Sequence, residues 1–158
     1  MERIDHLASK IPEDRLDWTP PIPRAFSISV LLGHLMETVS GFCAVLYAAF
    51  PDRLGHFLEL KMLSADRITG PAGMRQRLEV YGERIREGFT LLADADLGRK
   101  IPTVFVPEGE SLLSLLLVNF EHLASHKHQL FMYLKLLGVP VTTGDLYCWR
   151  GDAASGSR

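Results

Sequence analysis

Long segments with the apolar spacing of an α-helix, divided by prolines and glycines, dominate this sequence. Apolar side chains recur every three or four residues, as they do on the buried face of a helix. Proline and glycine stand near the boundaries, where they commonly begin or end helices. The segments with this spacing cover residues 1–11, 27–49, 54–63, 71–93 and 112–137. Helical segments joined by loops predict an all-α bundle.

Capping residues define the ends of the predicted helices. Ser27 or Ser29 can accept an amide hydrogen bond at the start of the second segment, and Ser111 can open the last one. Pro71 suits the first position of a helix, because the amide it lacks would have no helical partner there. Gly138 directly follows the last periodic residue, as a helix stop does.

Two connections are predicted to be loops. Residues 13–26 contain three prolines, which exclude a helix or a central strand, and we expect Trp18 and Phe26 to hold this loop in place. Residues 101–106 favour a strand by composition, but no partner strand is visible in the sequence. We therefore predict a loop there.

Length and charge indicate one globular domain. A chain of 158 residues can bury roughly 70% of its unfolded surface, so it needs no disulfides for stability. We expect residues 1–150 to form a single domain and the small, polar tail 151–158 to be disordered. The net charge of −2 comes without a basic stripe, which argues against nucleic-acid binding. No apolar run reaches the ~20 residues that would span a membrane.

The amino terminus and the cysteines predict a cytoplasmic location. The first ten residues, MERIDHLASK, lack the continuous apolar core of a signal peptide. Cys43 and Cys148 are too few and too far apart for a disulfide framework, so we expect free thiols. Cys43 follows His34 by nine residues, about 180° around a helix, and is expected to be a buried apolar residue.

One face of the last predicted helix carries polar side chains where a bundle needs apolar ones. At ~100° per residue, His122, His126, Gln129 and Tyr133 fall within about 60° of one another. His128 lies about 120° away by the same arithmetic and is expected on the surface. A divalent ion is a partner that two inward-facing imidazoles at i and i+4 can share. The apolar residues that continue this line toward the amino terminus are Leu115 and Val118.

His34 is the best candidate for a third ligand. It lies in SISVLLGHLMETV, on the face of an amphipathic helix that we expect to point inward. A core histidine without a metal is the alternative reading. His6 and His56 are expected on the surface, although either could replace His34. The residues that flank His34 on this face are Val30, Leu31, Leu35 and Thr38.

Three segments, in this order, resemble the DinB/YfiT superfamily of small helical metalloproteins. The first is PEDRLDWTP. The second, AFSISVLLGHLMETV, is similar to the family pattern W-S-x-x-x-L-x-x-H-L, with Phe26 at the usual tryptophan and His34 at the first ligand. The third, EHLASHKHQLFMYLKLLGVP, is similar to H-x-x-x-H-R-G-Q-x-x-x-Y-L-R-L-x-G-x-x-P. There His122 and His126 stand at the ligand positions and Gln129 at the glutamine.

The resemblance implies an antiparallel four-helix bundle, frequently a homodimer, that holds one divalent ion through His34, His122 and His126. Zinc or nickel is favoured over iron or manganese. Lys127 replaces the common arginine and His128 the common glycine, so His128 could join the site.

Three histidine ligands leave open coordination positions, which is typical of a catalytic metal. Relatives that use low-molecular-weight thiols imply a thiol S-transferase acting on a small electrophile. In that hypothesis Gln129 or Tyr133 orients a ligand or fixes an imidazole tautomer. Both could equally serve as hydrogen-bond partners between helices.

Two other functions use the same ligands. In a metal-dependent hydrolase the ion activates water, and Glu37 is the candidate general base, although a solvated charge on the helix surface is the favoured interpretation of Glu37. Glu121 is expected to be solvated. In a non-catalytic dimeric stress-response or binding module, the protein binds metal without turnover.

Overall fold

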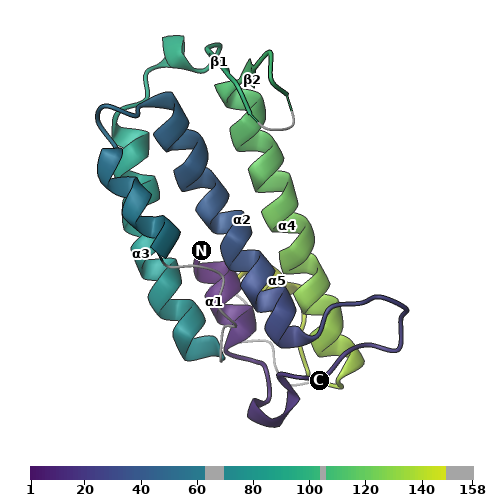
Figure 1. Ribbon diagram of the computed structural model, residues 1–158. Helices are drawn as coiled ribbons and strands as arrows, with labels where there is room; N and C mark the ends of the chain where they lie inside the picture. The colour runs from purple at the N-terminus through teal and green to yellow at the C-terminus, as the bar shows by residue number, and fades with distance from the viewer. Residues whose placement is uncertain (63–69, 104–105, 149–158) are drawn as a thin grey trace.

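The computed structural model describes residues 1–62, 70–103 and 106–148, and most of these residues lie in helices (Figure 1). The predicted all-α class is therefore confirmed. The predicted disordered tail, residues 151–158, lies outside the described residues. The elements are α1 (Glu2–Ala8), η1 (Glu13–Arg15), α2 (Ile28–Ala49), η2 (Gly55–Met62), α3 (Pro71–Thr90), η3 (Asp94–Asp96), β1 (Lys100–Ile101), β2 (Glu110–Ser111), α4 (Leu112–Leu136) and α5 (Thr143–Tyr147), where η marks a 3₁₀ helix.

The long helices begin and end within a few residues of the predicted positions. At the start of α2, the amide of Val30 donates to Ser27 Oγ at 3.3 Å. At the start of α4, the amide of Ser114 donates to Ser111 Oγ at 3.1 Å. Each serine satisfies an amide that has no partner within the helix. Gly138 follows α4 with φ +77°, a left-handed conformation that glycine adopts without strain.

The two shorter predicted helices differ from the prediction, the first in length and the second in form. α1 ends at Ala8 rather than near Pro12, because the amides of Lys10 and Ile11 bond to carbonyls three residues back and tighten the chain into turns. The helix predicted over residues 54–63 is present as the 3₁₀ helix η2.

α2 lies at the centre of the fold and packs against both α3 and α4 (Figure 1). It runs antiparallel to α4. Near one end of the pair, the ring centroids of His34 and His126 are 4.5 Å apart. Further along α2, Gly41 lies against Asn119, which comes earlier in α4. This pairing brings two segments that are about 90 residues apart in the sequence onto one surface.

α2 and α3 run in the same direction. Cys43 lies 3.9 Å from the carbonyl oxygen of Tyr81, and the side chain of Leu46, three residues later, packs over Gly88. Parallel neighbours need a return connection, and η2 lies in the segment that joins them. The antiparallel arrangement predicted for the bundle therefore holds between α2 and α4 but not between α2 and α3.

The apolar character of α2 follows from its central position. By length and composition alone α2 could cross a membrane, a test that core helices of other proteins also pass. Here its apolar side chains pack against α3 and α4. Burying each large one contributes about 1.5–3 kcal/mol. The side chains that are fully buried in the main core include Leu31, Leu32, Leu35, Leu46, Met74, Leu130 and Leu134.

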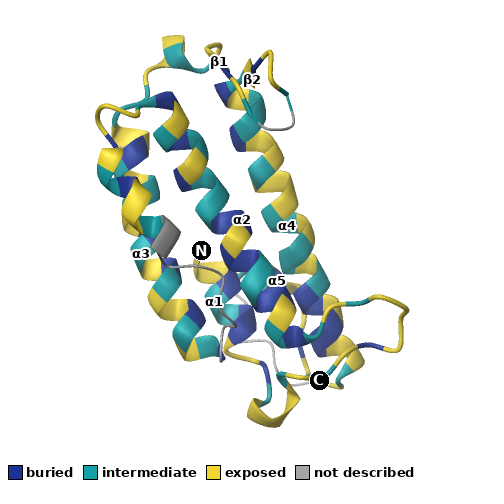
Figure 2. Cartoon of the chain, in the orientation of Figure 1, coloured by how far each residue is buried: buried dark blue, intermediate teal, exposed yellow. Residues whose placement is uncertain are grey.

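α1 lies beside only one half of α4, so the other half remains partly uncovered (Figures 1 and 2). Leu113 and Leu117 are exposed on the amino-terminal half of α4, and Phe89 is exposed near the end of α3 at the same end of the bundle. We call Leu113 and Leu117, which are four residues apart on one side of α4, the uncovered apolar face. Apolar side chains gathered on a surface commonly mark an interface.

The prediction of a loop over residues 101–106 is wrong at Ile101, which belongs to a short strand. Lys100 and Ile101 form β1, which pairs antiparallel with β2, and the register joins Ile101 to Glu110. The partner was overlooked because β2 has only two residues and directly precedes α4. Gly109, with φ +89°, allows the chain to turn back between the two strands. Residues 104 and 105 lie outside the described part of the chain.

The proline-rich loop before α2 is held by the two aromatic residues that the sequence singles out. The ring of Trp18 meets Tyr133 edge to face, with centroids 5.7 Å apart, and Phe26 lies 5.5 Å from the ring of His34. The amide of Ile28 also donates to the carbonyl of Trp18 at 3.0 Å. The loop is thereby fixed against α2 and α4.

Asp145 connects the two ends of the described chain. Its carboxylate accepts the amide of Thr142 at 2.8 Å in a capping box at the start of α5. Its other oxygen lies 2.9 Å from His6 Nε2 and 3.8 Å from Lys10 Nζ. The backbone hydrogen bond from Thr142, then the hydrogen bond to His6, lowers the pKa of Asp145 to about 2.

We expect Asp145→Asn to lower the melting temperature at pH 7 by a few degrees, since losing a cap costs about 1 kcal/mol. The lowered pKa means that the fold favours the ionised carboxylate. Its contribution is present above the ordinary pKa of 3.8 and is lost as the pH falls toward about 2. Thermal unfolding at pH 7 and pH 2.5 should therefore show a smaller difference between variant and wild type at the lower pH. An equal difference at both values would contradict this role.

Candidate metal centre

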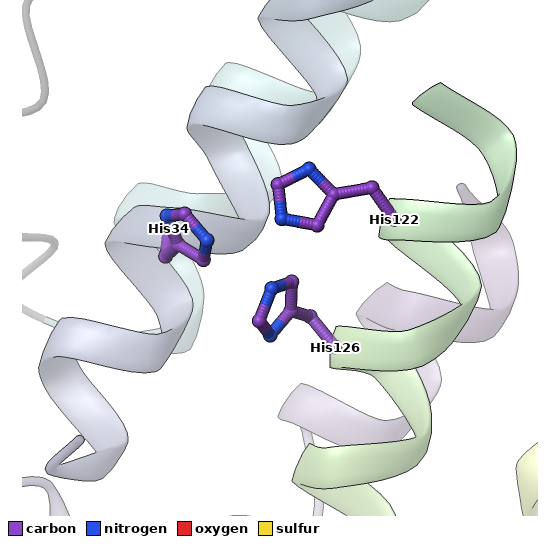
Figure 3. Close-up of side chains that lie close together, drawn as sticks. All are labelled: His34, His122 and His126. Carbon is purple, nitrogen blue, oxygen red and sulfur yellow. The ribbon is translucent and has the colours of Figure 1, made fainter. Parts of the chain in front are cut away.

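Three histidines from two helices come together between α2 and α4 (Figure 3). One ring nitrogen from each of His34, His122 and His126 lies within 4.8 Å of the others. The ring centroid of His34 lies 5.1 Å from that of His122 and 4.5 Å from that of His126. The centroids of His122 and His126 are 4.7 Å apart. The rings point toward a common space, which is the arrangement that a shared metal ion requires.

Helix geometry explains why these histidines meet. His122 and His126 are four residues apart, so their side chains lie one above the other on the same face of α4. The antiparallel packing places His34 of α2 opposite both of them. The two alternatives for the third position lie elsewhere, because His6 pairs with Asp145 and His56 lies 3.0 Å from Glu87 Oε1.

A close approach of the two helices sets the width of the site. Gly41 is two turns after His34, and Asn119 is one turn before His122. A Cβ atom on Gly41 would lie 2.6 Å from Asn119 Oδ1, much closer than side chains tolerate. Glycine therefore lets the asparagine amide fill the space against α2. Helical spacing puts Asn119 beside the polar face of α4, but it does not predict the pairing with Gly41, because a glycine inside a helix gives no signal until its partner is known.

Hydrogen bonds at the Nδ1 atoms fix two of the three rings. His34 Nδ1 lies 3.0 Å from Glu37 Oε2, and His126 Nδ1 lies 2.8 Å from Gln129 Oε1. Both oxygens are acceptors, so each Nδ1 carries the hydrogen and each Nε2 keeps its lone pair. Gln129 Nε2 in turn donates to Tyr133 Oη at 3.0 Å, which fixes the orientation of the amide. Imidazoles held in this way present Nε2 to a metal.

The donor set fits a divalent ion. Zinc–nitrogen bonds of about 2.0–2.1 Å in a tetrahedral site put the nitrogens roughly 3.3 Å apart. The observed separations of at most 4.8 Å close to that value through small side-chain rotations. The pKa of His122 is lowered, first because its ring is partly desolvated and then because charged His126 and His34 would repel its cation. A lowered pKa favours the neutral imidazole, which is the form that binds metals.

The expected inward direction of the polar stripe is wrong in one respect. His122 is exposed, Val118 is 62% exposed, and Val30 beside His34 is 47% exposed. The reason is that α2 and α4 meet along a line, and the histidines lie at the outer margin of that contact rather than in the core. One side of the cluster is therefore open to solvent.

The remaining polar residues from the sequence analysis take distinct positions. Glu37, the candidate general base, instead forms a hydrogen bond that fixes the ring of His34. Its position three residues after His34 in the same helix could have predicted this contact. His128 and Glu121 are exposed, and His128 takes no part in the cluster. Cys43 is buried on another side of α2, and burial raises the pKa of its thiol to about 12.

Comparison with known protein families matches residues 1–130 to the DinB superfamily. The matched range covers most of the chain and contains all three histidines of the cluster. No curated protein matches the chain.

We expect Gly41→Leu to lower the free energy of unfolding by about 1–3 kcal/mol, because a side chain there displaces Asn119 and overpacks the contact of α2 with α4. Gly33→Leu is the matched control in the same helix, since a Cβ atom there meets nothing within 4 Å. The control should leave stability unchanged or raise it by up to about 1 kcal/mol, because leucine favours a helix interior more than glycine does. Urea unfolding measures the free energy of unfolding of both variants. An equal loss of stability in the two would show that the close approach at Gly41 does not limit the helix spacing.

Proposed function

The chain belongs to the DinB superfamily, and we propose that it binds one divalent metal ion through Nε2 of His34, His122 and His126. The observation that carries this proposal is the convergence of three ring nitrogens within 4.8 Å, with two of the rings already held at Nδ1. We further propose the four-helix bundle of the family as the architecture, with α1 as its short fourth helix and the antiparallel course limited to the pair of α2 and α4.

The donor atoms favour zinc or nickel in this proposal, with iron and manganese less preferred. Neutral imidazole nitrogen suits zinc and nickel, whereas manganese prefers carboxylate and water oxygens. The carboxylate of Glu37 is engaged with Nδ1 of His34. It therefore strengthens a nitrogen donor instead of adding an oxygen donor.

The proposed activity is thiol transfer from a low-molecular-weight thiol to a small electrophile. A bound divalent ion supplies the chemistry by lowering the pKa of a thiol that reaches the open side of the site. The exposed position of His122 leaves room for a small molecule to approach. Val30 and Val118, one turn from His34 and His122, provide apolar surface beside that approach.

The thiol in this proposal comes from a small molecule. Cys43 is buried away from the histidines, and its pKa of about 12 keeps it protonated at neutral pH. Cys148 follows α5 and is also free. Neither belongs to the histidine cluster.

Hydrolysis is the second candidate, and the exposed carboxylate of Glu37 beside the cluster is the observation that favours it. A carboxylate there could take a proton from an attacking water. Its hydrogen bond to His34 argues for an orienting role, so we place thiol transfer first. Both activities suit the cytoplasmic location that the sequence predicts.

Each of His34→Ala, His122→Ala and His126→Ala should lose the metal that the wild-type protein binds at one ion per chain. We expect the affinity to fall by more than the roughly 10–100-fold typical of losing an orienting residue. Gln129→Ala should fall within that smaller range, because it removes only the acceptor at Nδ1 of His126. Elemental analysis of untagged protein gives the stoichiometry, and zinc competition with a chelator gives the affinity.

His128→Ala is the control for these variants. It removes an exposed histidine from the same helix, two residues beyond His126, and should leave the metal content unchanged. Wild-type stoichiometry and affinity in all three ligand variants would show that the metal site lies elsewhere.

Metal-loaded protein should accelerate adduct formation between a small thiol and a generic electrophile, and His126→Ala should abolish the acceleration. A panel of cellular thiols, including cysteine and glutathione, is offered with 1-chloro-2,4-dinitrobenzene and followed by absorbance. Metal-dependent cleavage of esters or amides, without any thiol reaction, would replace thiol transfer by hydrolysis. Metal binding without turnover in either panel would identify a non-catalytic binding module.

We also propose a homodimer that buries the uncovered apolar face. α1 covers only one half of α4, and Leu113, Leu117 and Phe89 stay exposed at the other end. A second copy of the chain could pack its own uncovered face there, as isologous dimers do.

Light scattering should give twice the monomer mass for wild type, and Leu117→Glu should give the monomer. Leu136→Glu is the matched control, because both leucines belong to α4 and are 56% exposed, but Leu136 lies at the opposite end of the helix. Wild-type protein that remains monomeric from micromolar to hundreds of micromolar concentrations would rule out the dimer.

A further inference from the structure

A cavity of about 280 Å³ lies between α1 and α4, away from the histidine cluster. Lys127 of its lining follows His122 by five residues, which is about 140° around the helix. The cavity therefore opens on nearly the opposite face of α4. The residues that form its floor and rim include Arg3 and Ile4 from α1 and Phe120, Leu123, Ala124 and Lys127 from α4.

The floor of the cavity is apolar and of a size for a small organic molecule. Ile4 is buried, Leu123 and Ala124 are half-buried, and Phe120 is 62% exposed at the rim. Ligand cavities commonly hold about 300–1,000 Å³, so this one lies just below that range. A short aliphatic chain or a single aromatic ring matches it better than a larger ligand does.

Two cationic side chains border the cavity without a carboxylate partner. Within residues 1–62, 70–103 and 106–148, neither Arg3 nor Lys127 forms an ion pair. Lys127 is nevertheless held in place. Its ammonium group donates to the carbonyl of Leu146 at 3.0 Å and lies 5.1 Å from the ring centroid of Tyr147. A fixed cation beside an apolar surface is ready to receive an anion.

The charges that line the cavity agree with this geometry. Glu2 also lines it and places one negative charge beside the two cationic side chains. An anion between Arg3 and Lys127 would supply the negative charge that these two side chains lack.

We propose that this cavity binds a small amphipathic monoanion, with its apolar body against Ile4, Leu123 and Phe120 and its charged head between Arg3 and Lys127. A single carboxylate is favoured over a polyanion, because a second negative charge would lie beside Glu2. The site does not depend on the metal centre. Its ligand would bind on the face of α4 that is turned away from the histidines.

Octanoate is the probe, and 1-octanol, with the same chain and no charge, is its matched neutral analogue. Binding to full-length protein is followed by changes in amide chemical shifts during NMR titration, with and without zinc. Octanoate should bind one site per chain, with the largest shifts at α1 and at residues 120–127. Octanol should bind at least about tenfold more weakly, since a charged hydrogen bond is worth roughly 1.5–3 kcal/mol.

The variants separate charge from packing. Lys127→Met keeps the aliphatic stem, and Arg3→Gln alters an exposed residue whose loss should not unfold the protein. Each variant should bind octanoate with an affinity about fivefold or more below that of the wild type. Lys135→Met is the control, because Lys135 also belongs to α4 and lies 5.0 Å from the ring centroid of an aromatic residue, Phe131, but does not line the cavity.

Three results would overturn the proposal. The first is the absence of saturable changes in amide chemical shift with octanoate at millimolar concentration. The second is an affinity for octanol equal to that for octanoate. The third is a loss of octanoate affinity in Lys135→Met as large as that in Lys127→Met or Arg3→Gln. If Lys127→Met fails to fold, Arg3→Gln alone decides the question. Because zinc should leave the octanoate affinity unchanged, a failure of this proposal is distinguishable from a failure of the proposed metal function.

Discussion

The contact between α2 and α4 is the interaction on which the rest of the structure depends. It is the longest antiparallel helix pair in the fold, and it alone brings His34 to the two histidines of α4. Gly41 makes the contact close, because the amide of Asn119 occupies the space that any Cβ atom would need. The same residue that narrows the helix pair therefore sets the distance between ligands, and a bulkier residue would change stability and site together.

The loop before α2 joins this contact through aromatic rings. Trp18 meets Tyr133, the hydroxyl of Tyr133 accepts from Gln129, and the amide oxygen of Gln129 accepts from Nδ1 of His126. Each member of the series fixes the next, so the orientation of one ring depends on a loop more than 100 residues earlier in the sequence. Phe26 packs against His34 from the same loop. Proline-rich rigidity in that segment thus serves the site as well as the fold.

Periodicity predicted the long helices and the polar face of α4, because both depend on local repeats that one sequence displays. It also made His34 the best candidate for the third ligand and placed His6 and His56 on the surface, and the structure brings His34 to the other two while His6 and His56 pair with Asp145 and Glu87. What it could not predict depends on partners distant in sequence. The parallel course of α2 and α3 and the exposure of His122 follow from how helices pack, which helical spacing alone does not specify. The pair of β1 and β2 was missed because two residues give no detectable pattern.

The charges around the histidines explain why two chemistries compete for one site. Three neutral imidazoles would leave the charge of a divalent ion undiminished. The carboxylate of Glu37 would affect the ion only indirectly, through its hydrogen bond with Nδ1 of His34. An anionic donor is therefore favoured at the open side over a neutral one. Val30 and Val118, each one turn from a histidine of the cluster, are partly exposed apolar side chains. In the proposed thiol transfer, a small thiol would be favoured over water, because its apolar body could bury surface against these valines while its sulfur carries the charge.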